Sequence, residues 1–204
     1  FPPEALVPGD VLITNDPYKT AGQLLDVTVL VPVWRKVGGD EFPSIVAYFG
    51  STIHHTDVGG YGIGAGGRDC FEEGLWIPIC KLMIAGERNE DVWRFILSNV
   101  RQPDHMAGDL HAQMASGEVG AQRLAVLCDS HGLNDIEELS DEIINRSEVA
   151  TRASIRTLTS GSFPGAAVLD LADGSQIDIV CSINVDAEAG EITVDYTGTS
   201  PASP

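Results

Sequence analysis

Two adjacent histidines and an aspartate, His54, His55 and Asp57, directly follow an apolar run. Imidazole exchanges protons near neutral pH and, together with carboxylates, binds divalent metals. If the strand stays extended, His55 and Asp57 share one face and His54 points to the other. Spacing alone therefore makes one histidine a ligand or base and the other a packed core group. The alternative interpretation is a tight glycine-rich connection with one satisfied core histidine.

Glycines crowd the stretch that follows, residues 58–71. Glycine adopts backbone conformations closed to other residues, so backbone can pass close to whatever the histidines hold. We expect the loop from Gly59 to Gly67 to close over a pocket. The run at residues 62–67 lacks the spacing, the following lysine and the helix start of a phosphate-binding loop.

Other acidic side chains extend the possible donor set beyond the first three. Imidazole and carboxylate groups in such a mixture are of the kind that Zn, Mn or Fe accept. The candidates are His54, His55, Asp57, Asp26, Asp16 and Asp69. No GxSxG or HExxH pattern occurs, and serine–histidine catalysis has no local signature. The remaining histidines, His105, His111 and His131, are interpreted as surface or helix-end residues.

Composition excludes several classes of function. A net charge of −18 argues against binding to nucleic-acid phosphates, which requires clustered Lys and Arg. The four cysteines form no CxxC pair, which favours reduced thiols in the cytoplasm. No apolar run approaches the ~20 residues of a membrane span, and we expect neither a signal peptide nor a membrane partner. The first residues, Phe1-Pro2-Pro3, and the end directly after a strand pattern indicate an interior piece of a longer polypeptide.

Three strands are predicted before the histidines, at residues 10–14, 26–34 and 44–53. In the second strand Val27, Val29, Val31 and Val33 alternate onto one face, and Pro32 suggests a sheet edge or a strand end. Residues 36–43 are predicted to form a hairpin loop. The third strand is apolar on both faces, which predicts a buried central strand that delivers the histidine pair.

Helices are predicted in the middle of the chain. After an extended, mostly buried segment at residues 71–81, a helix follows Asn89 and stops before Pro103. Its predicted inner face carries Val92, Phe95, Ile96 and Val100. A longer helix at residues 104–130 contains small residues that permit close packing. A third helix begins after Asn134 and runs to about residue 158.

The last fifty residues change to the alternating pattern of strands, at residues 166–171, 175–185 and 191–197. We expect an antiparallel meander with Ile177, Ile179, Cys181 and Ile183 buried on one face. The fold class is α+β, with a mixed or antiparallel sheet around the histidine site, a three-helix segment and this meander. The corresponding regions are 1–86, 87–160 and 161–204, the last being the start of a further domain.

Ordered motifs over nearly the whole chain resemble the hydantoinase B/oxoprolinase family. The motifs include Thr14-Asn15-Asp16-Pro17-Tyr18, Leu25-Asp26-Val27-Thr28-Val29, His54-His55-x-Asp57-Val58-Gly59-Gly60, Glu73-Gly74-Leu75-x-Ile77-Pro78, Asn89-Glu90-Asp91-Val92, Gly108-Asp109-Leu110-x-Ala112-Gln113 and Asp195-Tyr196-Thr197-Gly198-x-Ser200-Pro201. Family members include the B-type polypeptide of N-methylhydantoinase, the C-terminal half of 5-oxoprolinase and the large subunits of acetone and acetophenone carboxylases.

The resemblance implies a division of labour between two subunits. A hydantoinase A-type partner binds ATP and Mg and phosphorylates a carbonyl-derived oxygen, and the B-type subunit handles the activated small-molecule intermediate. It also implies a divalent metal, Mn or Zn, held by Asp26 and by His54 or His55. The remaining metal position of the family, a histidine, falls on Gln23, and an amide is a far poorer ligand than imidazole. The implied catalytic residues are His54, His55, Asp57 and Asp26.

Three functions follow as hypotheses. The first is a B-type subunit of an ATP-dependent carboxylase that acts on a ketone, as in the acetophenone and acetone carboxylases. The second is a subunit of an ATP-dependent ring-opening amidohydrolase for a hydantoin or lactam. The third is a non-catalytic scaffolding subunit, for which Gln23 is the sequence argument.

The 204-residue chain alone should neither bind ATP appreciably nor turn over substrate, because it has no phosphate-binding loop and the resemblance places ATP on a partner. Calorimetric titration checks this expectation. Micromolar binding of ATP by this chain alone would contradict it.

Overall fold

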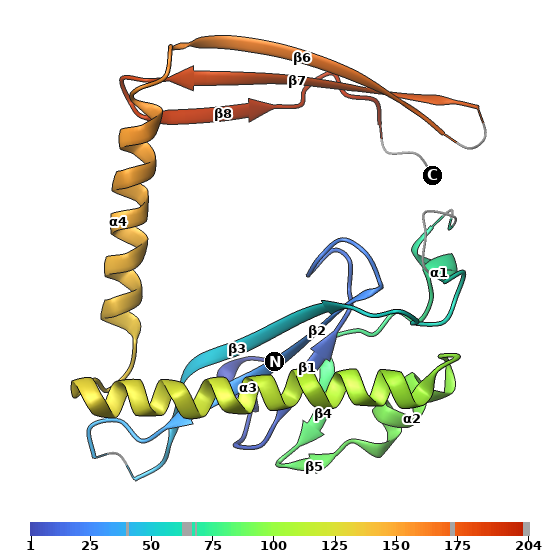
Figure 1. Cartoon of the computed structure of the whole chain (residues 1–204), viewed down its shortest axis with the longest axis vertical. Helices are drawn as coiled ribbons and strands as arrows, with labels where there is room; N and C mark the ends of the chain where they lie inside the picture. Colours follow the sequence, from blue (N-terminus) through green and yellow to red (C-terminus); the bar gives the residue numbers. More distant parts are fainter. Residues whose placement is uncertain (40, 63–66, 68, 172–173, 202–204) are drawn as a thin grey trace. The chain divides into compact units, whose positions relative to one another are not determined.

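The computed structural model describes residues 1–39, 41–62, 67, 69–171 and 174–201 (Figure 1). Contacts within the chain group them into two compact units, Phe1–Ile136 and Glu137–Pro204. The division into 1–86, 87–160 and 161–204 stays a prediction about domains. Among the described residues, no helix has both the length and the apolar character needed to cross a bilayer.

The first unit is built on a five-stranded antiparallel sheet, which confirms the α+β class and an antiparallel sheet. A short 3₁₀ helix, η1 (Pro3–Ala5), precedes it. The strand order is β3-β2-β1-β4-β5. The strands are β1 (Val11–Thr14), β2 (Asp26–Arg35), β3 (Ser44–His54), β4 (Cys80–Ile84) and β5 (Glu87–Arg88).

The alternation predicted for β2 is confirmed, because Val27, Val29, Val31 and Val33 are all buried. Pro32 was predicted at an edge or a strand end, but β2 lies between β3 and β1. The sheet tolerates this proline because β1 pairs only with residues 28–30 of β2. At Pro32, β2 therefore has a paired strand on the β3 side alone.

The prediction of a buried central strand at residues 44–53 is wrong. Strand β3 is an edge strand of the sheet, and its residues are exposed or only partly buried. Apolar residues on both faces indicate burial only where both faces are covered. In this unit the long helix α3 (Pro103–His131) packs on β2 and β3 (Figure 1).

The expected extended segment at 71–81 is also corrected, because its first residues form the short helix α1 (Cys70–Glu73) and its last two begin β4. Helix α2 (Glu90–Ser98) forms where predicted, and three residues of its predicted inner face, Val92, Ile96 and Val100, belong to the core or pack against it. Trp93 and Ile96 are buried, whereas Phe95 is exposed. The Trp93 indole N–H donates to the Leu82 carbonyl at 3.2 Å, so the burial of the large ring sets the rotation of this helix.

Small residues let α3 approach the sheet closely, as expected. A Cβ at Gly117 would collide with the Val31 side chain, and one at Gly120 would collide with the Phe49 ring. The helix ends at Gly132, which has a left-handed conformation (φ 65°). Close packing of α3 on β2 and β3 fixes the two strands that carry the candidate site.

The second unit contains α4 (Glu137–Ile155) and an antiparallel meander of β6 (Gly161–Asp170), β7 (Gln176–Asp186) and β8 (Glu191–Asp195). The meander is confirmed. The residues predicted to be buried on one face of β7 are less buried than expected. Ile177, Ile179 and Cys181 are only partly buried, and Ile183 is exposed. Alternation gives the face of a side chain but not how completely that face is covered.

Asp10 fastens the start of β1 to β4 and to the turn that follows β4. Its buried carboxylate accepts bonds from Lys81 Nζ at 2.6 Å and from the backbone N–H groups of Val7 and Ala85, each at 2.9 Å. Burial alone would raise the pKa of Asp10, but these bonds outweigh it and lower the pKa. The stabilisation is therefore present above the unfolded-state pKa of about 3.9 and is lost as pH falls through the lower folded-state pKa.

Asp10→Asn should lower the free energy of unfolding by about 1–3 kcal/mol at pH 7, because it removes the charge that Lys81 and two N–H groups satisfy. The difference from wild type should shrink as pH falls below about 4. Urea unfolding at several pH values measures this. Asp91→Asn, at an exposed ion pair with Arg94, is the matched control and should change little. A difference that does not vary with pH would contradict the assigned role.

Candidate functional site

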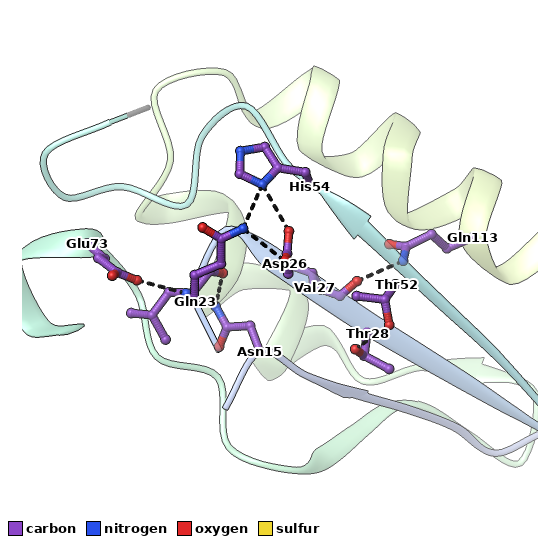
Figure 2. A network of polar contacts seen from close by, with 10 residues as sticks. Asn15, Gln23, Asp26, Val27, Thr28, Thr52, His54, Glu73 and Gln113 are labelled. Carbon is purple, nitrogen blue, oxygen red and sulfur yellow. Dashed lines mark hydrogen bonds and ion pairs between the residues drawn. The ribbon is translucent and has the colours of Figure 1, made fainter. Parts of the chain in front are cut away.

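Strand pairing brings Asp26 and His54 together. Asp26 begins β2, His54 ends β3, and the antiparallel register places them directly opposite each other. Their side chains meet, with His54 Nδ1 2.9 Å from Asp26 Oδ1 (Figure 2). The imidazole is about half exposed (48%) and the carboxylate is more covered (18%). An imidazole held by a carboxylate and open to solvent is suited to proton transfer.

Gln23 completes this cluster from the loop before β2. Its Nε2 lies 2.9 Å from Asp26 Oδ2 and 3.2 Å from His54 Nδ1. An ionised carboxylate can only accept, so the shorter contact with Asp26 places the proton of His54 on Nδ1. The 3.2 Å contact between Gln23 Nε2 and His54 Nδ1 then joins two donors and is not a hydrogen bond. The lone pair of the other ring nitrogen, Nε2, is then free to accept a proton.

The face of the sheet that carries the cluster continues with polar side chains. Two residues further along the ladder, the hydroxyl oxygens of Thr28 and Thr52 are 2.8 Å apart. Val27 and Val29, on the opposite face, belong to the apolar core. At this end of β2 and β3, polar side chains therefore lie on one face of the sheet and core side chains on the other.

Two further residues hold the loop that carries Gln23, and sequence reasoning did not place either of them at the site. Asn15 is fully buried, and its Nδ2 donates to the carbonyls of Leu24 at 2.7 Å and Leu75 at 2.9 Å. Glu73 Oε2 accepts from the Leu24 N–H at 2.9 Å (Figure 2). Both residues lie in the motifs that resemble the hydantoinase B/oxoprolinase family, and this was the sequence signal that could have pointed to them. Spacing could not, because the contact of Glu73 with Leu24 spans 49 residues and that of Asn15 with Leu75 spans 60.

His55 turns toward α3 and is buried (1% exposed). Its Nε2 lies 3.2 Å from Gln113 Oε1, and its Nδ1 lies 3.7 Å from Asp109 Oδ2. Burial lowers the pKa of His55, outweighing the opposing effects of Gln113 and Asp109, which favours a neutral ring. Spacing predicted one functional and one packed histidine, and these contacts make His55 the packed one.

Asp57 is an anchor for the start of α3. Its carboxylate accepts from the Gly59 N–H at 2.9 Å, the Arg101 guanidinium at 3.0 Å, the Gln102 N–H at 3.3 Å and the Arg101 N–H. Burial alone would raise the pKa of Asp57, but these donors outweigh it and lower the pKa. These partners lie in the Gly59 turn and the segment before α3, so Asp57 does not join the cluster of Gln23, Asp26 and His54.

The glycines bring the chain close to itself. A Cβ at Gly59 would lie 2.5 Å from the Asn99 carbonyl oxygen, and one at Gly60 would collide with the backbone of Glu72 and Glu73. Both have positive φ angles, 87° and 56°. The predicted closure of residues 59–67 over a pocket falls partly outside the described residues, which omit 63–66 and 68.

The remaining acidic candidates, Asp16 and Asp69, accept hydrogen bonds from backbone N–H groups close to them in the sequence. Asp16 Oδ1 accepts from the Tyr18 N–H at 2.9 Å, as in a turn. Asp69 caps α1 by accepting from the N–H groups of Phe71 and Glu72. Neither contact involves the cluster of Gln23, Asp26 and His54.

The donor set of the cluster does not suit a resident Zn or Mn ion. Among the described residues, no group of three or more His, Cys, Asp or Glu side chains is placed to hold a metal. Asp26 Oδ1 and His54 Nδ1 are close enough to share a cation, but the third position presents an amide N–H donor from Gln23. An N–H donor cannot coordinate a metal, and the amide oxygen is a weaker ligand than imidazole.

The chain is similar to several proteins at 30% identity or more. A Pseudomonas sp. (strain NS671) protein, named as the B component of a D-/L-hydantoinase, is 33% identical over 201 residues, covering 95% of this chain and 33% of that protein. The crystal structure of ATP-dependent caprolactamase from Pseudomonas jessenii matches with a TM-score of 0.81 and 30% identity, covering 93% of this chain and 32% of the other. The chain thus spans about a third of the length of these two relatives.

A more distant structure shares the fold. Acetone carboxylase, in its nucleotide-free structure, matches with a TM-score of 0.77 at 17% identity, covering 94% of this chain and 27% of the other. The sequence pattern that defines hydantoinase B/oxoprolinase proteins matches residues 2–204. This chain belongs to the hydantoinase B/oxoprolinase family.

Proposed function

We propose that this chain is part of a B-type subunit of an ATP-dependent enzyme that opens a cyclic amide, and that Asp26 and His54 supply its base. The observation that carries the proposal is the 2.9 Å contact between Asp26 and a half-exposed His54. The names of two relatives at 30% identity or more, a hydantoinase component and a caprolactamase, support a cyclic amide as substrate.

In this proposal a hydantoinase A-type partner binds ATP and phosphorylates the amide oxygen. Water then adds to the activated carbonyl carbon, and the Nε2 lone pair of His54 takes the proton that the water loses. Asp26 holds the ring through Nδ1–H and stabilises the imidazolium that forms. Cleavage of the C–N bond opens the ring, and the imidazolium returns its proton to the leaving nitrogen. The acyl phosphate that remains is then hydrolysed by a second water to the carboxylate and inorganic phosphate.

A ketone carboxylase is the second candidate, since acetone carboxylase has the same fold. In that reaction the same base would remove a proton next to the ketone carbonyl, and the resulting enolate would attack activated carbon dioxide. A likeness at 17% identity supports the fold alone, so the cyclic-amide hydrolase comes first. A non-catalytic scaffold is the third candidate.

The first test is the turnover of hydantoins, lactams and ketones by the full-length protein assembled with its partner, with and without bicarbonate. The proposal predicts ATP-dependent ring opening that does not require bicarbonate. Consumption of a ketone only when bicarbonate is present would replace it with the carboxylase.

In the same assembly, His54→Ala and Asp26→Ala should each abolish turnover, because they remove the base and the group that orients it. Subunit assembly, followed by size-exclusion chromatography, should be unchanged. The control His131→Ala removes an exposed histidine from the end of α3 and should leave turnover unaffected. Loss of assembly together with loss of activity would instead favour the scaffold.

Gln23→His should raise metal affinity if only the missing imidazole keeps it low, since His54 and Asp26 already lie within contact distance of position 23. Metal analysis of both proteins, after dialysis against Zn or Mn, measures this. Occupancy should fall as pH drops toward about 6, where imidazole becomes protonated. Equal, negligible metal in wild type and variant would leave a metal role without support.

A further inference from the structure

Gln113, a buried residue in the middle of α3, reaches into the ladder beside the Asp26–His54 pair. Its Nε2 donates to the Val27 carbonyl at 3.0 Å (Figure 2). It also donates to the Ser51 carbonyl at 2.8 Å. Val27 belongs to β2 and Ser51 to β3, so one amide group bridges the two strands. The side chain is only 3% exposed, so water does not readily replace either bond.

These two bonds fix the orientation of the amide. Both acceptors are backbone carbonyls, which cannot donate, so the NH₂ group must face them and Oε1 must face the other way. Oε1 lies 3.2 Å from His55 Nε2. Because Oε1 can only accept, His55 must carry its proton on Nε2.

The same reasoning gives the neighbouring histidine the opposite tautomer. His54 contacts the Asp26 carboxylate through Nδ1, so its proton is on Nδ1 and its bare nitrogen is Nε2. His55 has a bare Nδ1 instead, and this buried atom has no hydrogen-bond partner in the described part of the chain. The exposed ring thus keeps its free lone pair for chemistry, whereas the buried ring uses its N–H for packing.

The residues that Gln113 holds are next to the reactive pair. Val27 directly follows Asp26, and His55 directly follows His54. The backbone N–H of His55 also donates to the backbone carbonyl of Leu25 at 2.8 Å, which ties the residue after β3 to the residue before Asp26. One carboxamide on α3 therefore holds Val27, the neighbour of Asp26, and His55, the neighbour of His54.

We propose that Gln113 is a positioning residue for the Asp26–His54 pair, holding β2 and β3 in place and keeping His55 in the Nε2–H tautomer. The link to catalysis rests on the proposed function, but the link to structure and tautomer does not. The bonds are donated by an amide, so an apolar side chain of similar size cannot replace them.

Two-bond ¹H–¹⁵N correlation spectra of the ¹⁵N-labelled 204-residue chain test this directly, because they show which ring nitrogen carries the proton. The His54 signals are identified by their loss in His54→Gln. The expected result is Nδ1–H for His54 and Nε2–H for His55. Nδ1–H in His55, or the same tautomer in both rings, would overturn the proposal. This test uses the wild-type chain, so it does not depend on whether a Gln113 variant folds.

Gln113→Leu supplies the second arm, with Gln122→Leu at an exposed position of the same helix as the matched control. In Gln113→Leu, His54 should lose its single tautomer and show averaged ring-nitrogen shifts, whereas Gln122→Leu should match wild type. A folded Gln113→Leu protein with an unchanged His54 spectrum would overturn the proposal.

Kinetics of the assembled enzyme separate this inference from the proposed function. Gln113→Leu should lower kcat by about 10²-fold with little change in KM, as expected when a reacting group is displaced by about 1 Å. An assembly in which wild type has no ring-opening activity would refute the proposed function, and the tautomer spectra would still decide the role of Gln113. A fall in kcat equal to that of Gln122→Leu would count against positioning.

Discussion

The candidate site depends on the register between β2 and β3. The pairing that sets Asp26 opposite His54 also sends Val27, Val29, Val31 and Val33 into the core. A slip of one residue in β2 would turn these valines to the solvent face and move Asp26 away from His54. Burial of the valines therefore maintains the geometry of the Asp26–His54 pair. The register shift in the ladder, between Val33 and Trp34, lies at the other end of β2 and does not disturb it.

Three carboxamide side chains do most of the positioning around this register. Asn15 ties the loop before β2 to the segment after α1, Gln113 ties β2 and β3 to α3, and Gln23 contacts Asp26 and His54. An amide both donates and accepts, so it can satisfy the backbone groups left over where strands end. A buried network of this kind is rigid when complete and costly when one member is lost. Rigid support lets the exposed imidazole hold one tautomer while remaining open to solvent.

Much of the fold could be predicted from local patterns, and the errors have a common cause. The alternation in β2, the helix positions and the meander depend on neighbours in sequence, and they are confirmed. The central place predicted for β3 and the burial predicted for Phe95 in α2 are wrong, because both depend on what covers each element. Trp93, whose N–H donates to the Leu82 carbonyl, is buried, and Phe95 is exposed. Periodicity does not report such tertiary requirements.

The candidate site was predictable only in part, for the same reason. Family-like motifs gave Gln23, Asp26 and His54, which the structure brings together. Asp57 has the same chemistry as Asp26, but Arg101, 44 residues away, takes its carboxylate for the start of α3. Asn15 and Gln113 were not predicted at the site because their partners lie up to 86 residues away. The spacing of His54 and His55 predicted that one of them is packed in the core. Only the contacts and burial in the structure identify that residue as His55.

The central claim is that Asp26 orients His54 as a base, and turnover by the assembled enzyme carrying Asp26→Asn tests it most directly. This change preserves shape, but the amide can donate to Nδ1 and so place the ring proton on Nε2, where the base must be free. The account predicts that kcat falls by about 10²–10⁴-fold, with assembly intact. Turnover equal to that of wild type would contradict it.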